Sequence, residues 1–346
     1  MGRSGESSRR PYPVCGLPEP LDAGASPIGY NQSMPSITCD VDAWLQAGGE
    51  RRAYDVLSRI GRVRVFTDGS ARCMASIHPA RPAQGALADW TGEVEVLEAA
   101  EAWLADEGCE RAVGPMYLCR WFPYRANHGP FDAAPLLYEA PAQAAPWEAA
   151  GYSPVERYVS IVCRHQRQID AGTGAAARLA MRGWRLEALG DSAAPLSRER
   201  FDRALGTILK VAGEAFVTLD GFVDVPSEAV ADWYRPLRHL IDPRLVFFVY
   251  DPAGEPAGFL LGLPDKLAPG RDWFQIVTLA VRPAHQRAGV GAWMVAAAHR
   301  AAMRLGLDAG VHGPIHVAGD RLEDTTWFHG ELVRRYSLLG KQLDVG

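Results

Sequence analysis

The sequence predicts a mixed α/β fold that is used twice in tandem along its 346 residues. Three observations support this prediction. Apolar residues make up 48% of the chain, which is enough for a sizeable core. Strand and helix patterns alternate, and the order hairpin, helix, strand occurs once in each half. Three extended segments in succession precede the main helix of the second half, and this order excludes a Rossmann fold.

In the first half, two extended segments flank Asp68-Gly69, a hairpin signal. Apolar residues then recur on one face of a predicted helix, which stops at Gly108 before a short strand and a Gly-Pro step. A further strand is expected at 157–163. The two hairpin strands are expected at 62–66 and 71–77, and the helix at 94–107.

The second half repeats this order, because its helix stops at Gly306 and a strand with a Gly-Pro step again follows. The correspondence indicates an internal duplication. Strands are expected at 184–189, 245–250, 256–263, 273–281, 311–318 and 332–339, and helices at 197–216, 227–240 and 291–305.

Composition divides the chain into four parts. Pro, Gly and Ser supply 17 of the first 36 residues, so residues 1–36 are expected to form a flexible tail. One domain is expected at 37–168 and a second at 183–346. A linker is expected between them at 169–182, because the run from Gly172 to Ala177 interrupts the preceding strand-like pattern.

Charge and cysteine content exclude several classes of function. The 36 basic and 41 acidic residues give a net charge of -5, which offers no footprint for nucleic acid or an anionic membrane. No apolar run approaches the ~20 residues that cross a bilayer. The cysteines contain no close pair, so neither a metal site nor a redox dithiol is predicted, and reduced thiols in the cytoplasm are expected. They are Cys15, Cys39, Cys73, Cys109, Cys119 and Cys163.

The most informative segment runs from Ile276 to Gly291, from a strand through a polar loop into a helix. Pro283 ends the strand, and Gly289 and Gly291 let backbone approach a ligand closely. The following helix offers unpaired N–H groups and the positive end of its dipole. The segment therefore predicts an anion site, at which a pyrophosphate would gain several charge-assisted hydrogen bonds.

This segment resembles the signature of the GNAT superfamily of acyl-CoA-dependent N-acyltransferases. The signature consists of Gln or Arg, two residues, Gly, one residue, then Gly or Ala, and Gln286, Gly289 and Gly291 match it. Gly114-Pro-Met and other segments over residues 60–340 resemble a bacterial subgroup that holds two such folds in tandem. Residues 84–90 of the first half lack the Gln-x-x-Gly-x-Gly loop, so the first copy is expected to be degenerate and to hold no CoA.

The resemblance implies acyl-CoA, with acetyl-CoA as the first candidate, as the co-substrate, and no metal. It places the pyrophosphate on the backbone of the loop and pairs the pantetheine amides with a strand that diverges from its neighbour. A backbone N–H near Leu279 or Ala280 would stabilise the oxyanion. The implied cofactor-binding residues are Leu279, Ala280, Val281, Gln286, Arg287, Ala288, Gly289, Val290 and Gly291.

Candidate proton carriers follow the CoA helix. His312 and His316 are four residues apart on a predicted strand, so alternation places both on one sheet face, where either is a candidate base. A pair of structural histidines is the alternative. Glu323, beside Asp324, is a second candidate base, although such loop carboxylates also cap helices. In many GNAT enzymes a tyrosine of the following helix acts as the acid for the leaving thiolate. That tyrosine is missing here, and Tyr336 is the nearest phenol.

Other polar and aromatic residues are candidates for the acceptor cleft. Asp220 and Asp224, between the first two helices of the second half, are candidates for binding an acceptor amine, and surface placement is the alternative. Trp121, Tyr124 and His128 of the first half are candidates for the cleft wall, or else pack between the two copies.

The leading hypothesis is transfer of an acyl group from CoA to a small amine or amino acid derivative. The alternatives are transfer from an acyl-carrier protein and a non-catalytic CoA-binding module; the oligomeric state stays open. Residues 1–170 hold 16 basic and 21 acidic residues, whereas 171–346 hold 20 of each. We therefore expect the second half to hold the anionic cofactor and the acidic first half to face a cationic amine.

Overall fold

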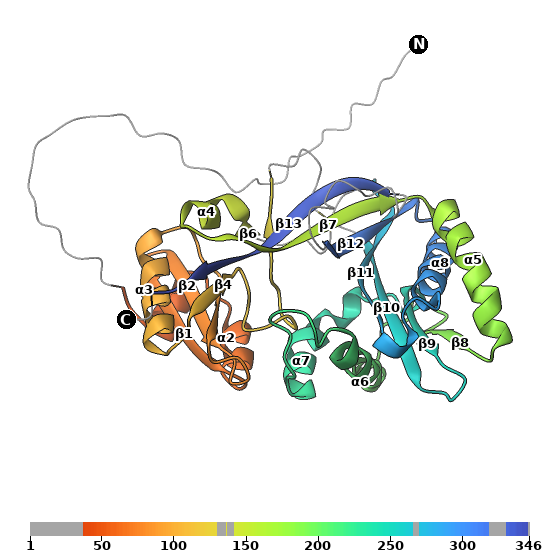
Figure 1. Ribbon diagram of the computed structural model, residues 1–346, viewed down its shortest axis with the longest axis horizontal. Coiled ribbons are helices and arrows are strands. Elements are labelled where there is room, and N and C mark those ends of the chain that lie inside the picture. The colour runs from red at the N-terminus through yellow and green to blue at the C-terminus, as the bar shows by residue number, and fades with distance from the viewer. Residues whose placement is uncertain (1–36, 130–135, 137–141, 266–269, 318–329, 345–346) are drawn as a thin grey trace, which may run out of the picture. The chain divides into compact units, whose positions relative to one another are not determined.

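The computed structural model describes residues 37–129, 136, 142–265, 270–317 and 330–344 (Figure 1). The first half contains the hairpin, helix and strand that the sequence predicts, and a third strand that alternation missed because four of its five residues are buried. Its elements are α1 (Val41–Gln46), α2 (Arg51–Leu57), β1 (Arg62–Asp68), β2 (Ala71–Ile77), β3 (Gln84–Ala88), α3 (Val94–Asp106), β4 (Arg111–Gly114), β5 (Ala126–Asn127), β6 (Ala142–Gln143), α4 (Ala144–Ala149) and β7 (Ser153–Cys163).

The second half follows its predicted order closely, with one added helix at its start. Three short 3-10 helices interrupt the connections. The elements are α5 (His165–Met181), β8 (Arg185–Ala188), α6 (Arg198–Ala215), α7 (Ser227–Tyr234), η1 (Arg235–Leu240), η2 (Pro243–Leu245), β9 (Val246–Tyr250), β10 (Pro256–Asp265), β11 (Trp273–Val281), η3 (Pro283–His285), α8 (Val290–Arg304), β12 (Ala309–Val317) and β13 (Gly330–Gln342).

The described strands form one mixed sheet in the order β1-β2-β3-β4-β13-β7-β12-β11-β10-β9-β8, with β5 and β6 beside this path. The last strand of each half extends the sheet of the other half. β13 lies between β4 and β7 and pairs antiparallel with both, while β7 also pairs with β12 (Figure 1). The mixed α/β fold class is confirmed, and the order of three strands, a helix and a strand occurs in each half, with both halves sharing a single sheet.

The linker expected at 169–182 is wrong, because these residues lie in helix α5 and in the turn that ends it. Gly172, one of the small residues that suggested a linker, packs directly against α8. A Cβ on Gly172 would lie 2.3 Å from the carbonyl oxygen of Ala292 and 2.5 Å from the Cβ of Ala296. The small residues therefore permit a close helix–helix contact, which composition alone does not distinguish from a linker.

Helices cover both faces of the second-half sheet, as alternation along β9 illustrates. Phe247 and Val249 pack in the cluster that includes α8, whereas Val246 and Phe248 pack in the cluster that includes α6. Successive residues of a strand point to opposite faces, so each face buries its own apolar row. None of the helices in the described residues combines the length and apolar character needed to cross a bilayer.

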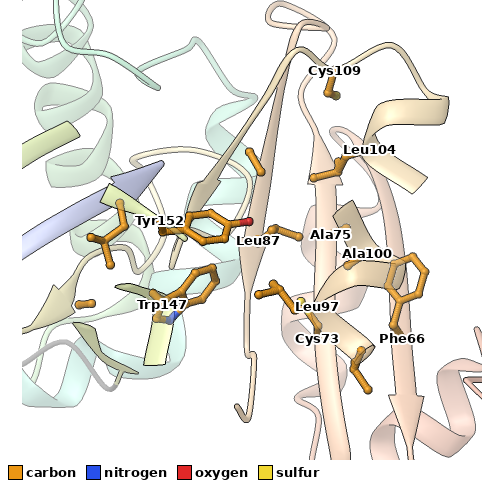
Figure 2. Packing of buried hydrophobic residues seen from close by; sticks show 14 of the residues in the cluster. Phe66, Cys73, Ala75, Leu87, Leu97, Ala100, Leu104, Cys109, Trp147 and Tyr152 are labelled. Atoms are coloured by element: carbon orange, nitrogen blue, oxygen red, sulfur yellow. The ribbon is translucent and has the colours of Figure 1, made fainter. Parts of the chain in front are cut away.

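The first half has a core of its own, in which Leu97, Ala100 and Leu104 of α3 cover the sheet. The same cluster contains Trp147 of α4 and Tyr152, whose rings lie 5.1 Å apart (Figure 2). Trp147 also fills the space beside Gly114, where a Cβ would lie 2.4 Å from its ring. Aromatic packing therefore occupies the region around the end of β4.

Candidate functional site

The parallel strands β11 and β12 part in the middle of the second-half sheet. They pair from Trp273 with Ala309 as far as Ile276 with His312, and within the described residues no β12 partner faces 278–281. β11 bulges at this point, because Ile276 and Thr278 oppose consecutive residues of β10. A bulge bends its strand and increases the local twist. The backbone of 278–281 thus has an open side along which an extended ligand can pair.

The loop after β11 gathers backbone N–H groups at the start of α8. Arg287 and Gly289 both have positive φ, of 61° and 98°, and Gly289 is the N-cap of α8. In the described chain no backbone carbonyl accepts from the N–H groups of Arg287, Ala288 or Gly289. Successive N–H groups in such a turn form an anion-binding nest, and the helix dipole adds to its positive potential.

Gly289 is required here for two reasons. Its φ lies in the left-handed region, which side chains other than glycine adopt only at a cost. A Cβ would also lie 2.7 Å from the Cβ of Ala175 in α5, well inside van der Waals contact. Gly291 differs, because a Cβ there would lie 3.5 Å from Leu279, an ordinary contact distance. The first glycine therefore shapes the loop, and the second keeps the groove beside it open.

A groove of about 460 Å³ runs from the loop along the open part of β11. It brings together eight of the nine residues expected to bind the cofactor; the ninth, Ala288, is exposed on the same loop. The Gln286 side chain donates a 3.0 Å hydrogen bond to the carbonyl of Val281, so it braces the loop against β11. The groove is lined by Ala215, Phe216, Leu279, Ala280, Val281, His285, Gln286, Arg287, Gly289, Val290, Gly291 and Ala292.

Two exposed arginines lie beside the nest, and one of them was missed by the sequence analysis. Arg287 belongs to the loop itself and makes no ion pair with any described residue. Arg178 of α5 is the missed one: its Nη2 lies 3.7 Å from the position of a Cβ on Gly289. Arg282, by contrast, is paired with Glu214 at 2.7 Å. Arg178 was not considered because residues 169–182 were expected to form a linker.

The expectation that His312 and His316 share a sheet face is wrong. β12 shifts register against β7 between His312, which faces Ile161, and Ile315, so that His316 faces Tyr158. Ile161 and Tyr158 are three apart on a regular stretch of β7 and point to opposite faces, and their β12 partners do the same. The extra residue at the Gly313-Pro314 step breaks the alternation that the prediction assumed.

His312 belongs to a buried chain of three imidazoles. Its Nε2 lies 2.8 Å from Nε2 of His299 in α8, and Nδ1 of His299 lies 2.8 Å from Nδ1 of His165 in α5. Nε2 of His165 lies 2.7 Å from the carbonyl oxygen of Leu307, which can only accept. When His165 donates its Nε2–H to this carbonyl and accepts at Nδ1, the protons run in one direction, from His312 through His299 and His165 to Leu307.

Burial sets the protonation of this chain. It lowers the pKa of His312 to about 4, and it lowers the pKa of His299, to which the neighbouring His312 and His165 contribute. Both rings are thus neutral at pH 7, and the Nε2 proton of His312 is used in the bond to His299. The geometry gives His312 a structural role in joining β12 to α8 and α5.

His316 has the opposite environment, because its side chain is exposed on the other face of β12. Its ring lies 5.3 Å from that of Tyr158. Tyr336 of β13 faces Tyr158 but is 1% exposed, and its hydroxyl lies 3.1 Å from Oγ of Ser160. Of these candidates only His316 is accessible. Glu323 and Asp324 lie outside the described residues.

Trp121 of the first half packs against the second half, which is the alternative to a place in the cleft wall. The ring of Trp121 lies 5.2 Å from that of Phe222, which belongs to the loop between α6 and α7. Asp220 of the same loop is held by Arg81 at 2.6 Å and by Arg111. Two guanidinium groups therefore neutralise this carboxylate, which argues against Asp220 as a candidate for binding an acceptor amine.

The corresponding region of the first half is closed. Five residues connect β3 to α3, and among them Asp89 is bound by Arg72 at 2.8 Å and the Trp90 indole donates to the carbonyl of Glu93. The N–H of Met116 donates to the carbonyl of Leu87, which joins β3 to the chain after β4. The space that forms a groove in the second half is thus filled in the first.

Comparisons with known proteins agree with these features. Residues 214–314 match the model of the acetyltransferase (GNAT) family. The second half therefore contains a GNAT domain, and its matched residues include β11, the loop and α8. No curated protein matches the chain.

Solved structures similar to this chain show low identity. A GCN5-related N-acetyltransferase from Sphaerobacter thermophilus is 14% identical, with 87% of this chain and 89% of that chain covered and a TM-score of 0.45. A tandem GNAT protein from the clavulanic acid biosynthesis pathway is 11% identical, with 87% and 92% covered and a TM-score of 0.43. A probable N-acyltransferase from Enterococcus faecalis V583 is 10% identical, with 88% and 68% covered and a TM-score of 0.49.

Proposed function

We propose that the protein is an acyl-CoA-dependent N-acyltransferase that acylates the amine of a small molecule or amino acid derivative by direct attack in a ternary complex. The observation that supports this best is the groove where β11 and β12 part, with the nest of N–H groups at its end. The nest suits the pyrophosphate of CoA, and the open side of β11 suits the amides of pantetheine. Acetyl-CoA is the first donor to try.

The residues of the groove support CoA over a carrier protein as donor. The phosphopantetheine of a carrier protein has a single phosphodiester, whereas CoA has a pyrophosphate and a further phosphate on its ribose. The loop offers several N–H groups, and Arg178 and Arg287 add two exposed cations beside them. This supply of donors and charge matches the more highly charged ligand.

The transfer requires that the amine nitrogen bond to the thioester carbonyl carbon while the carbon–sulfur bond breaks. The amine must lose a proton, and the departing sulfur must gain one. A backbone N–H of β11 near Leu279 or Ala280, where no described β12 residue pairs, would stabilise the oxyanion. His316 is the accessible imidazole on the exposed face of β12, and we assign it as the base.

The test is release of free thiol from acetyl-CoA and longer acyl-CoAs across a panel of amines. We expect turnover with at least one pair and its loss in Gly291→Glu, which places a carboxylate in the groove. Gly206→Glu is the matched control, because Gly206 is exposed on α6 and its Cβ would meet no atom within 4 Å. An absence of turnover in the wild type, with acyl-CoA bound, would favour a non-catalytic CoA-binding module.

A further inference from the structure

Two buried arginines of the first half enclose a tyrosine on the His316 face of the sheet. The guanidinium carbon of Arg125 lies 4.2 Å from the ring centroid of Tyr124, and that of Arg120 lies 5.1 Å from it. Arg125 also lies 5.0 Å from the ring of Tyr158. We call Arg120 and Arg125 the guanidinium pair.

Only one member of the pair has an anionic partner among the described residues. Arg120 forms an ion pair with Glu156 and donates to the hydroxyl of Tyr158, which in turn donates to Glu156. Arg125 is 7% exposed, and its Nη1 lies 3.4 Å from the Tyr124 hydroxyl. Its Nε is buried and has no hydrogen-bond partner among the residues that the structure describes. A buried guanidinium with an unused donor is costly, unless a ligand completes it.

The backbone holds Arg125 firmly in this position. Its φ is 87°, a left-handed conformation that is strained for any residue other than glycine. Its N–H donates to the carbonyl of Pro115 at 2.9 Å, and β5, which follows directly, pairs with β13. Strain that the surrounding structure maintains is typical of positions where a side chain must be aimed.

The electrostatic effect of the pair is visible in Tyr124. Burial opposes ionisation of this phenol, yet the nearby charges of Arg125 and Arg120 outweigh burial and lower its pKa from the ordinary value. The surroundings of Tyr124 are thus positive, although the first half as a whole carries the surplus of acidic residues. Overall charge therefore misleads about what this face attracts.

The pair also lies next to the candidate base. The guanidinium carbon of Arg125 lies 5.0 Å from the ring centroid of Tyr158, and the exposed ring of His316 lies 5.3 Å from the same ring. Arg125 and His316 therefore both border this tyrosine, so one small ligand can engage the guanidinium and the imidazole together. That spacing fits an amine and a carboxylate on one small molecule.

We propose that Arg125 binds a carboxylate of the acceptor, so that the substrates are amines that also carry a carboxyl group, as amino acids and related compounds do. This rests on the proposed acyltransferase activity. The planar guanidinium suits a carboxylate, and its unused Nε–H supplies the directed donor. This assignment replaces the expectation, based on the charge count, that the acidic first half faces a cationic amine.

The first test reads binding without acyl-CoA, so that it is independent of turnover. The Nε–H resonance of Arg125 is followed by nuclear magnetic resonance during titration with acetate, acetamide and inorganic phosphate. We expect acetate to shift it saturably and acetamide to leave it unchanged. An equal response to acetamide, a response to phosphate alone, or a Tyr124 phenolate at neutral pH in the free protein would overturn the proposal.

The second test uses pairs of amines that differ only by a carboxyl group, such as phenylalanine and phenethylamine, in the thiol-release assay. Arg125→Gln is expected to raise KM for the carboxylated member about tenfold or more and to leave KM for the other unchanged, with Arg125→Lys in between. Arg157→Gln, exposed on the opposite face of β7, is the control. Equal effects on both members would contradict carboxylate binding, whereas no turnover at all would count against the acyltransferase proposal.

Discussion

The ring of His316 lies 5.3 Å from the ring of Tyr158, edge to face, although the two residues come from different halves of the chain. The exchange of last strands brings them together, because β7 of the first half pairs with β12 of the second. In the proposed function, the first half therefore contributes Tyr158 beside the assigned base, His316.

Gly289 and Gly291 should respond differently to the same substitution. Gly289→Ala forces a side chain into a left-handed conformation and against Ala175, so we expect a loss of roughly 1 kcal/mol or more in stability and weaker binding of acetyl-CoA. Gly291→Ala lies inside helix α8 with an ordinary contact distance, so stability should be unchanged or rise by roughly 0.5 to 1 kcal/mol. Urea unfolding and calorimetry measure both quantities. Equal losses for the two variants would contradict this loop geometry.

The two exposed arginines beside the nest should contribute to CoA affinity in a salt-dependent way. Arg178→Gln and Arg287→Gln are each expected to weaken acetyl-CoA binding about threefold to tenfold, because each removes one charge from the surroundings of the phosphates. Arg282→Gln should have a smaller effect, since that guanidinium is already paired with Glu214. Titrations at low and high salt provide the measurement. Affinity that is independent of salt in the wild type would count against electrostatic binding by this loop.

His316 was a candidate base and Tyr336 the nearest phenol for the leaving-group acid, and the structure places them in different environments. His316→Gln should lower kcat about a hundredfold with little change in stability, because the ring is exposed and is assigned as the base. Tyr336→Phe should leave kcat nearly unchanged, since this buried hydroxyl contacts Ser160. The thiol-release assay compares them directly. The reverse order of effects would move the proton transfer to β13.

The buried histidine chain should make stability depend on pH. The folded-state pKa of His312 is lowered from about 6.5 to about 4, so its contribution is present above pH 6.5 and is lost as the pH falls toward 4. This shift corresponds to about 3 kcal/mol of stability. The lowered pKa of His299 adds to the same loss at low pH. Urea unfolding at pH 7.5 and pH 5 measures the loss.

His312→Gln should reduce this dependence on pH, because the group that must stay neutral is gone. His239→Gln is the control, since His239 is exposed on the 3-10 helix η1. A wild type with equal stability at the two pH values would show that these imidazoles are not held neutral by burial.

The sequence predicted the local structure well because periodicity and glycine signals are local. The strand, loop and helix around Gly289 are an example, since Pro283 and the glycines mark the boundaries of β11 and α8. Strand exchange was not predictable in this way, because β7 and β13 have similar patterns and nothing local specifies which neighbour each will take. For the same reason the guanidinium pair was not predicted, because its contact with Tyr158 forms only once β7 pairs with its neighbouring strands.

Two errors have a physical cause in single residues. Gly172 was interpreted as a sign of a linker, although it permits α5 to approach α8 closely. The Gly313-Pro314 step adds one residue to β12, and this reversed the face of His316 relative to His312. Sequence periodicity cannot predict either effect, because one depends on the neighbouring helix α8 and the other on the neighbouring strand β7.

The central claim is that one CoA site exists per chain, in the second half and at the loop before α8. Calorimetric titration of the full chain with acetyl-CoA tests it most directly, in the wild type and in Gly291→Glu. The account predicts a stoichiometry of one in the wild type and no binding in the variant. A stoichiometry of two, or undiminished binding in Gly291→Glu, would contradict it.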